Sequence, residues 1–547
     1  MSFHHISIWR RSANKLRQNE AWLECLYISG LTVAVLMLFM VNLTYLPLLD
    51  PQEGKLALVA KKVYQRMMTD GIFSGFWGEP DFLRSHLIHN IVAFVYHIAG
   101  ANELTTRLPG ALLGGMSVII LYYIGREIFV ARLPALFSAL VYLTCLPVVR
   151  YSRLACLSGP LLCFELLTIW AVLRTRRNLQ WALVIGIGFS LMSLTKGLFA
   201  MQILIIVLLF LLWDTPRLLT SAYFWGGITI GAIPSITWYL VQILRYWQLK
   251  NNWNFLTIWL SPNLTTVFKP ELSASSYLLH FAPYFIPWLF IMYAGTQSIK
   301  KNFHWGWGKL LAVWLGGYLV LGVLIIPQDY RLVLPLFPPL ALTAGKQLER
   351  VRNLSSEIKY PQVWIYGFSL MSVLTALAGI NWGIHNYVDF YLPFICGFLS
   401  ITFGATAIIM SQQDKQFIPL LFWGLFVSIF LLVISPHWIW ELNATEPVKP
   451  IAEMIALHSE PRATIYSSMT EERPSLDFYS DRQVINQSIK DLKQHWQEDP
   501  EVYLLLDLTT LKQLNIPQQA VVQDRRFDSL GWVLVIKKSG TASNSSH

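Results

Sequence analysis

The stretch 417-FIPLLFWGLFVSIFLLVIS-435 contains no charged residue. An apolar run of about 18 residues is long enough to cross the hydrocarbon core of a bilayer as a helix. Across the 547 residues, 54% are hydrophobic and 14% are charged, whereas soluble domains average about 25% charged residues. The mean hydropathy is +0.46. The sequence therefore predicts an α-helical polytopic membrane protein rather than an ordinary soluble one.

Similar apolar runs recur along the chain and predict about 13 transmembrane helices. The expected spans are 24–45, 106–125, 132–148, 158–173, 181–195, 198–213, 220–243, 277–297, 308–326, 331–346, 362–383, 388–411 and 417–435. The segment 86-HLIHNIVAFVYHIAG-100 is almost long enough to span, but it contains three histidines. Counting it as a span would also place the basic loops outside, so we expect a helix at the membrane interface.

The loops between the predicted spans carry the charge that indicates the orientation. Lys and Arg are enriched in 126–132, 174–177, 214–217, 298–301 and 346–359. Cytoplasmic loops of membrane proteins carry such an excess. We therefore expect residues 1–23 on the cytoplasmic side and the C-terminal segment on the extracytoplasmic side. These loops also account for the net charge of +10, so no nucleic-acid partner is needed.

Outside the expected membrane domain, 24–435, the C-terminal segment alternates strand-like and helical runs. The expected strands are 463–469, 502–508 and 532–538, and the expected helices are 447–459 and 488–496. The sequence therefore predicts a small α/β soluble domain over 436–540, followed by a disordered tail at 541–547. The polar and aromatic segment 473-RPSLDFYSDR-482 is typical of a turn leading into a strand, and we assign it no role.

The long outer loop 46–105 opens with 50-DPQEGKLALVAKKVY-64, which predicts an amphipathic helix over 52–68. Its apolar face consists of Leu56, Val59, Ala60, Val63 and Met67. Such a helix lies in the membrane interface, where its basic residues meet anionic lipid headgroups, or it packs against the helical bundle. The sequence leaves both interpretations open.

Acids and arginines in this loop would stand beside the bilayer. Nucleotide-activated sugars are normally cytoplasmic, so group transfer on the outer face needs a donor carried by lipid. A sugar linked to a polyprenyl phosphate fits, because its phosphate binds Arg or Lys and its acceptor hydroxyl needs a carboxylate base.

Six short motifs occur in order along the chain. They are 51-PQE-53, 78-GEPDFLRSH-86, 102-NELTTRLPGAL-112, 153-RLACLSGPLLCF-164, 195-TKG-197 and 330-YRLVLPLFPPLAL-342. Through them the chain resembles the GT-C membrane glycosyltransferases that include the protein O-mannosyltransferases and the bacterial lipid A aminoarabinose transferases. The resemblance implies inverting transfer of a sugar from a polyprenyl-phosphate donor to an extracytoplasmic lipid, glycan or protein. It also implies a multi-pass protein of the plasma (inner) membrane.

The chain departs from the family pattern at three acidic positions. Gln52 stands at the place of the catalytic Asp, Leu83 at the place of a Glu, and Ser158 at the place of an Asp. A carboxamide cannot act as a general base, because it has no proton acceptor that titrates near neutral pH. The resemblance therefore assigns the catalytic position to Gln52 and Glu53, with Glu53 as the substitute base. Nearby alternative acids are Asp50, Asp81 and Glu103.

The resemblance also implies a set of cations that bind the donor phosphate. We assign this role to Arg84, Arg107, Lys196, Arg153 and Arg331. Arg84 replaces the family Lys, or anchors the chain at the interface. Lys196 lies at a span end on the outer face, where the charge bias of loops does not explain a cation. Arg331 contacts the phosphate or pairs with Asp329, and that choice stays open.

No cofactor is identified by the sequence. His86, His89 and Asn90 could ligate a divalent metal, but Leu83 replaces the acid that the family links to metal binding, so we do not favour one. The five cysteines form no CxxC pair and predict neither a zinc site nor a disulfide framework.

Two other functions are retained as alternatives. A catalytically degenerate protein on the same scaffold would bind a lipid-linked glycan without transferring it. A lipid or glycan transporter is less favoured, because we see no inverted repeat and no charged residue within a span. The sequence does not name the sugar, the acceptor or the oligomeric state.

Overall fold

The computed structural model describes residues 3–70, 87–250, 282–324, 334–354, 360–385, 389–444, 447–461, 463–517, 520–522, 526 and 531–537. The chain divides into two compact units. The first consists mainly of Met1–Asn42 and Gly110–Ser435, and the second of Leu43–Gly78, Ile88–Pro109 and Pro436–His547. This division differs from the predicted one, because most of the outer loop 46–105 belongs to the same unit as the C-terminal domain.

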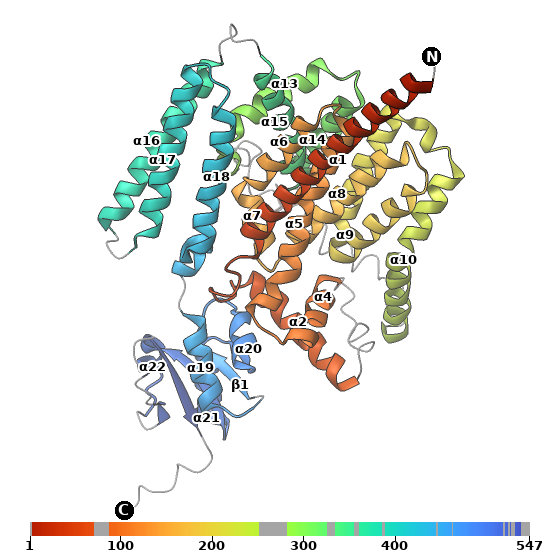
Figure 1. The fold of residues 1–547 in the computed structure, drawn as a ribbon. Helices are drawn as coiled ribbons and strands as arrows, with labels where there is room; N and C mark the ends of the chain where they lie inside the picture. The colour runs from red at the N-terminus through yellow and green to blue at the C-terminus, as the bar shows by residue number, and fades with distance from the viewer. Residues whose placement is uncertain are drawn as a thin grey trace, which may run out of the picture. The chain divides into compact units, whose positions relative to one another are not determined.

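The first unit is built from helices, which are drawn in Figure 1. They are α1 (Phe3–Met40), most of α5 (Glu103–Ile128), α6 (Arg132–Leu143), α7 (Leu146–Arg153), α8 (Ser158–Thr175), α9 (Trp181–Asp214), α10 (Ala222–Lys250), α13 (Leu289–Lys301), α14 (Gly306–Leu324), α15 (Phe337–Arg352), α16 (Gln362–His385), α17 (Tyr391–Ser411) and α18 (Phe417–Ile434). Neighbours in sequence often pack together: α8 lies against α9, α9 against α10, α16 against α17, and α17 against α18.

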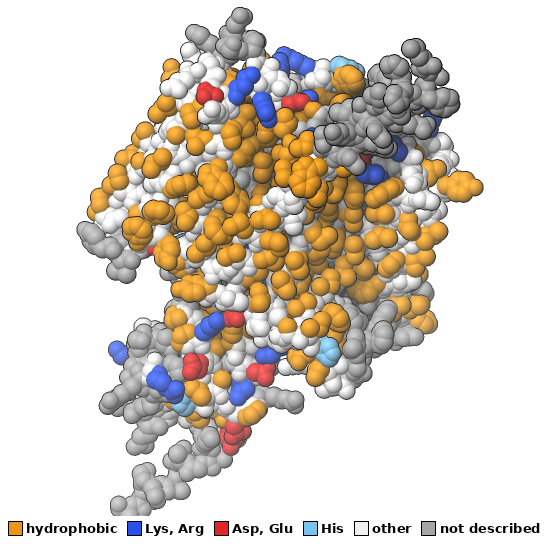
Figure 2. Space-filling view, in the orientation of Figure 1, with side chains coloured by type: hydrophobic (Ala, Val, Ile, Leu, Met, Phe, Trp, Pro, Cys, Tyr) orange, Lys and Arg blue, Asp and Glu red, His pale blue; other side chains and the backbone are white. Residues whose placement is uncertain are grey.

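Seven of the described helices are long and apolar enough to span a membrane, or eight if α6 and α7 form one broken span. Large hydrophobic side chains are exposed along α16 and α17, and Figure 2 shows such side chains spread over the helical unit. A helix that is apolar all round belongs in a core or a membrane. The chain is therefore a multi-pass membrane protein, as the apolar runs predicted, whereas the expected number of about 13 spans stays a prediction.

Two breaks interrupt the helices of the first unit, one inside a predicted span and one between two predicted spans. Helices α6 and α7 cover the predicted span 132–148 but meet at an angle of 61°. Pro147 lies in the first turn of α7, where the missing amide hydrogen removes a bond that would continue α6. In α9, Lys196 has non-helical backbone angles (φ −156°, ψ 93°) and separates the two predicted spans 181–195 and 198–213.

Glycines allow α9 and α10 to approach each other closely. A Cβ added to Gly231 would lie 2.3 Å from the Leu183 carbonyl oxygen, and one added to Gly186 would lie 2.2 Å from that of Ile228. Gly227 and Gly231 form a GxxxG pattern on α10. Small residues at this spacing let membrane helices pack backbone to backbone, because lipid provides no hydrophobic drive for helix association.

The second unit contains a four-stranded sheet in the order β2-β1-β3-β4. Its strands are β1 (Thr464–Ser467), β2 (Gln483–Asn486), β3 (Val502–Asp507) and β4 (Trp532–Lys537). Strand β1 pairs in parallel with β2 and β3, and β4 runs antiparallel to β3. The three strands predicted from the sequence are confirmed, and β2 is an additional strand.

Helices cover both faces of this sheet. They are α19 (Val448–His458), α20 (Pro474–Ser480), α21 (Ile489–Glu498) and α22 (Leu508–Gln513). Leu505 of β3 packs with residues of α19 and with Leu476 of α20, whereas Leu504 packs with Leu492 of α21 on the opposite face. A strand buried on both faces reads as a continuous apolar run, as 502-VYLLLD-507 does. The predicted helices 447–459 and 488–496 are confirmed.

The second unit also contains α2 (Gln52–Asp70) and α4 (Leu87–Ala99). The apolar face predicted for 52–68 is largely buried, with Leu56 5%, Ala60 0% and Met67 4% exposed. Protein covers it, because α2 packs against α20, and Val63 and Met67 contact Ala93 of α4. Burial by protein describes this face better than immersion in the interface, but the neighbours are α20 and α4 rather than the helical bundle that we expected.

Candidate active site

Glu53 and Arg107 form a buried ion pair at the start of α2. Both side chains are 0% exposed. Arg107 Nε donates to Glu53 Oε1 at 2.9 Å, and Arg107 Nη2 donates to Glu53 Oε2 at 2.7 Å. This is the bidentate geometry in which a guanidinium binds a carboxylate most strongly. Glu53 Oε2 also accepts a hydrogen bond of 2.8 Å from the Leu49 amide.

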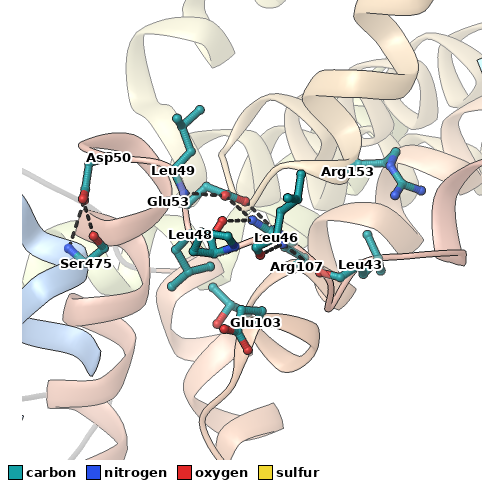
Figure 3. Close-up of polar contacts among 12 residues, drawn as sticks. Leu43, Leu46, Leu48, Leu49, Asp50, Glu53, Glu103, Arg107, Arg153 and Ser475 are labelled. Carbon is teal, nitrogen blue, oxygen red and sulfur yellow. Dashed lines mark hydrogen bonds and ion pairs between the residues drawn. The ribbon is translucent and has the colours of Figure 1, made fainter. Parts of the chain in front are cut away.

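The remaining donors of Arg107 bind the chain that leads into α2 (Figure 3). Arg107 Nη1 donates to the carbonyl oxygens of Leu43 (2.7 Å) and Leu46 (2.8 Å), and Nη2 donates to that of Pro47 (2.8 Å). A guanidinium has five N–H donors. All five are therefore used inside the protein, and none is left for a ligand phosphate.

Arg153 has an equivalent role within the first unit. It is 0% exposed. Its Nη1 donates to the Leu38 carbonyl at 2.6 Å, and its Nη2 donates to the Val41 carbonyl at 2.7 Å. The last carbonyls of a helix have no partner within that helix. Arg153 thus satisfies carbonyl groups at the C-terminal end of α1.

These contacts do not support the roles predicted for three residues. Glu53 was assigned as the substitute base, and Arg107 and Arg153 as phosphate ligands. A general base must come within hydrogen-bond reach of a substrate proton, which a fully buried carboxylate paired with arginine does not do. In this structure all three side chains contact backbone groups between Leu38 and Leu49.

Asp50 differs from Glu53 in both exposure and partners. It is half-buried, and it forms no ion pair with a residue that the structure describes. Its Oδ1 accepts a hydrogen bond of 2.9 Å from the Ser475 amide, and its Oδ2 accepts one from the Ser475 hydroxyl. Burial raises the pKa of Asp50 above its ordinary value, although both Ser475 bonds act in the opposite direction. A raised carboxyl pKa is typical of a proton-transferring group.

The contact between α2 and α20 depends on Gly54. A Cβ at this position would lie 2.3 Å from Asp50 Oδ1 and 2.7 Å from the Ser475 nitrogen. Only a residue without a side chain allows α20 to approach the start of α2 so closely. The segment 473–482, to which the sequence assigned no role, therefore contains the residue that holds Asp50.

Glu103, at the start of α5, lies in a second polar cluster. Its Oε1 pairs with Lys449 Nζ at 2.5 Å and accepts a hydrogen bond of 3.0 Å from the Tyr479 hydroxyl. The same hydroxyl accepts a bond of 2.9 Å from the Leu48 amide. Because a cation already matches its charge, Glu103 is a weaker candidate base than Asp50.

Other predicted site residues fall in different places. Lys196 is exposed at the break in α9. Gln52 is half-buried at the first position of α2, and Ser158 is half-buried at the first position of α8. Asp81, Arg84 and Arg331 lie outside the described residues, as do Leu83 and Asp329.

One argument used against a transporter is wrong. Glu165 lies within the candidate span α8 and is only 2% exposed. Trp314 Nε1 of α14 donates to its Oε1 at 2.9 Å. An ionisable residue does therefore occur within a candidate span. Glu165 was not recognised from the sequence because its neighbours in the span are apolar. Among the described residues, no group of three His, Cys, Asp or Glu side chains could hold a metal ion.

Comparison with protein families extends these observations. Residues 85–240 match the family model described as dolichyl-phosphate-mannose-protein mannosyltransferase. An uncharacterized protein from Aquifex aeolicus is 24% identical over 340 residues, which is 59% of this chain and 65% of that protein. Undecaprenyl phosphate-alpha-4-amino-4-deoxy-L-arabinose arabinosyl transferase 1 from Pseudomonas fluorescens is 24% identical over 306 residues, covering 52% of this chain and 54% of the relative. The chain thus spans only about half to two thirds of these relatives.

A further relative, the corresponding arabinosyl transferase from Erwinia tasmaniensis, is 21% identical over 73% of this chain and 71% of its own. The crystal structure of ArnT from Cupriavidus metallidurans bound to undecaprenyl phosphate superimposes with a TM-score of 0.72 at 15% identity. It covers 96% of this chain and 99% of ArnT. The apo form of that protein gives a TM-score of 0.69. At such identities the match establishes the fold.

The family model, the curated relatives and the shared fold all agree with the resemblance found in the sequence motifs. The chain is thus similar in sequence to polyprenyl-phosphate-sugar-dependent membrane glycosyltransferases, over residues 85–240 to the family model, and it shares the fold of ArnT.

Proposed function

We infer that this protein transfers a sugar from a polyprenyl-phosphate donor to an acceptor on the extracytoplasmic side of the plasma membrane. Its similarity to the family model over residues 85–240 and to the arabinosyl transferases supports the proposal. The N-terminus would be cytoplasmic and the C-terminal domain extracytoplasmic, as the basic loops indicate. The protein is thus proposed to act as an inverting glycosyltransferase, although Gln52 occupies the position of the family's catalytic acid.

Asp50 is the proposed base. Of the four acids considered near Gln52, Glu53 and Glu103 are in ion pairs, and Asp81 lies outside the described residues. Asp50 keeps contact with solvent and forms no ion pair with a described residue. Its carboxylate would take the proton of the acceptor hydroxyl as the acceptor oxygen bonds to the anomeric carbon. The bond from that carbon to the phosphate oxygen breaks, polyprenyl phosphate leaves, and the Asp50 proton passes to water.

Cations would stabilise the departing phosphate. Lys196 is proposed for this role because it is exposed at a break in an apolar helix, and a cation within an apolar membrane helix is typical of a functional site. Arg84 and Arg331 remain proposals from the family motifs. Arg107 is left out of the set because Glu53 and backbone carbonyls use all five of its donors, and Arg153 is left out because it is fully buried and donates to backbone carbonyls.

The test is the Asp50→Asn variant of the full chain in proteoliposomes. The probes are undecaprenyl phosphates carrying radiolabelled mannose, glucose or 4-amino-4-deoxyarabinose, and extracted membrane lipid, glycan and protein serve as acceptors. We expect kcat to fall about 100- to 10,000-fold, the usual contribution of general-base catalysis, with little change in the donor KM. Asp499→Asn is the matched control, because Asp499 pairs with His495 on α21.

A wild-type kcat in the Asp50→Asn variant would place the base elsewhere. The main alternative is a degenerate protein that binds lipid-linked glycans, which Gln52 favours because it cannot accept a proton. Under that alternative, undecaprenyl phosphate binds the wild-type protein, but none of the three labelled donors loses its sugar. That result would overturn the proposed transferase activity.

A further inference from the structure

We propose that α20 of the C-terminal domain is part of the transferase site, with Ser475 and Tyr479 as positioning residues for the turn that carries Asp50. This inference rests on the proposed function. It assigns to the C-terminal domain a role in the reaction that neither the family model, which covers 85–240, nor the sequence motifs assign.

Two contacts fix α20 on the 48–53 turn, and a third joins α20 to the helix α2 that follows the turn. Ser475 donates both its amide and its hydroxyl to Asp50. The Tyr479 hydroxyl accepts a bond from the Leu48 amide and donates one to Glu103. At the end of α20, Lys61 Nζ of α2 donates to the Phe478 carbonyl at 2.8 Å. Leu48 before Asp50, Asp50 itself and Lys61 after it are thus all hydrogen-bonded to α20.

The residues of α20 are themselves held rigidly. Leu476 is 0% and Phe478 is 4% exposed, and Leu476 packs into the core between α19 and the sheet. The helix ends at Asp481, which adopts the left-handed conformation (φ 56°). A catalytic group is effective when the residues that hold it are locked by packing and by second hydrogen bonds. The sheet domain therefore supplies a fixed support for the Asp50 carboxylate.

Ser475 also influences when Asp50 carries its proton. Burial raises the pKa of Asp50, whereas the hydroxyl and amide of Ser475 favour the charged carboxylate and lower it. Arg473 acts in the same direction as Ser475, Glu53 acts against it, and Asp477 lies close enough to interact with Asp50. Burial raises the pKa of Asp477 to about 6, and Lys62 opposes that shift. Removal of the Ser475 hydroxyl should therefore raise the pKa of Asp50.

The experiment compares Ser475→Ala with Ser475→Thr and with Ser488→Ala, all in the full chain in proteoliposomes with the labelled undecaprenyl phosphates. Ser488 caps α21 in the same domain, so its loss reports damage to the domain alone. For Ser475→Ala we expect kcat to fall about tenfold, as for the loss of one hydrogen bond, with an unchanged donor KM. The acidic limb of the kcat/KM profile should move to higher pH. Ser475→Thr keeps a hydroxyl and should restore both.

A purely structural role would lower the amount of folded protein but leave the acidic limb in place, and that outcome would overturn the proposal. Should Ser475→Ala fail to fold, Tyr479→Phe tests the other contact between α20 and the turn, because it removes the hydroxyl bound to Leu48 and keeps the ring. An unchanged kcat in Tyr479→Phe would likewise overturn it.

Hydrogen exchange separates this inference from the proposed function. The Leu48 amide should exchange about tenfold faster in Tyr479→Phe than in the wild type, whereas Ser488→Ala should leave it unchanged. If no donor is used by the wild type, the transferase function fails. The hydrogen-exchange rate of the Leu48 amide still shows whether α20 holds the turn. If that rate is the same in Tyr479→Phe as in the wild type, the positioning role is refuted too.

Discussion

Asp50 and Glu53 stand at the two ends of one short turn, and the fold gives them different surroundings. Glu53 is fully buried, and the fork of Arg107 binds it at 2.7 and 2.9 Å. Asp50 keeps contact with solvent and is held by the hydroxyl and amide of Ser475 instead of a cation. Glu53, to which the motif assigned the base, is thus buried in an ion pair, and Asp50, which lies outside the motif, is the proposed base. Partners and exposure, rather than position in a motif, determine what a carboxylate can do.

The largest expected effect comes from disrupting the buried ion pair between Arg107 and Glu53. Arg107→Met would leave a buried carboxylate without its cation and three carbonyls without donors. Breaking a buried ion pair by removing one partner costs about 3–5 kcal/mol. We expect a clear drop in the thermal midpoint of the detergent-solubilised protein.

Two controls define that result. Lys62→Met removes an exposed cation from α2 and should leave the midpoint unchanged. The double variant Arg107→Met, Glu53→Leu removes both charges and should recover much of the loss. If Arg107→Met melts like the wild type, the pair does not support the fold as described.

A smaller effect is expected from Gly54→Ala, which disturbs the Asp50 side. The added methyl group would overlap Asp50 Oδ1 and the Ser475 nitrogen. Overpacking of this kind costs about 1–3 kcal/mol, and the displaced turn should also lower kcat. Gly30→Ala is the matched control, because a Cβ on α1 at that position meets nothing within 4 Å. Normal stability and kcat in Gly54→Ala would show that α2 and α20 are not in close contact.

The smallest expected effect on stability comes from removing an exposed ion pair instead of a buried one. Lys55 Nζ pairs with Glu472 Oε2 at 3.2 Å, but the two side chains are 54% and 76% exposed. An exposed pair contributes about 0–1 kcal/mol and is screened by salt. Lys55→Ala should therefore change the thermal midpoint very little, and less still at high salt. A loss as large as that of Arg107→Met would contradict this ranking of the two ion pairs.

Local sequence patterns predicted much of the architecture. The apolar run 417–435 became α18, and the alternating runs 463–469, 502–508 and 532–538 became strands β1, β3 and β4. Helix α20 and strand β2 were not predicted. They are seven and four residues long, and elements this short give only a weak hydrophobic periodicity. The candidate site was harder to predict. The Ser475 contact joins residues 425 positions apart, and the Arg107–Glu53 contact joins residues 54 apart.

By itself, the sequence determined that this chain crosses a membrane and which family it resembles. Transfer of a helix into lipid depends on the sum of its own side chains, and family motifs are likewise local features. Only the tertiary structure decided which acid is neutralised, which arginines bind backbone carbonyls, and which helix supports Asp50. Those outcomes depend on burial and on partners brought together by folding, since an arginine beside a carboxylate and a hydroxyl beside it stabilise its charge to different extents.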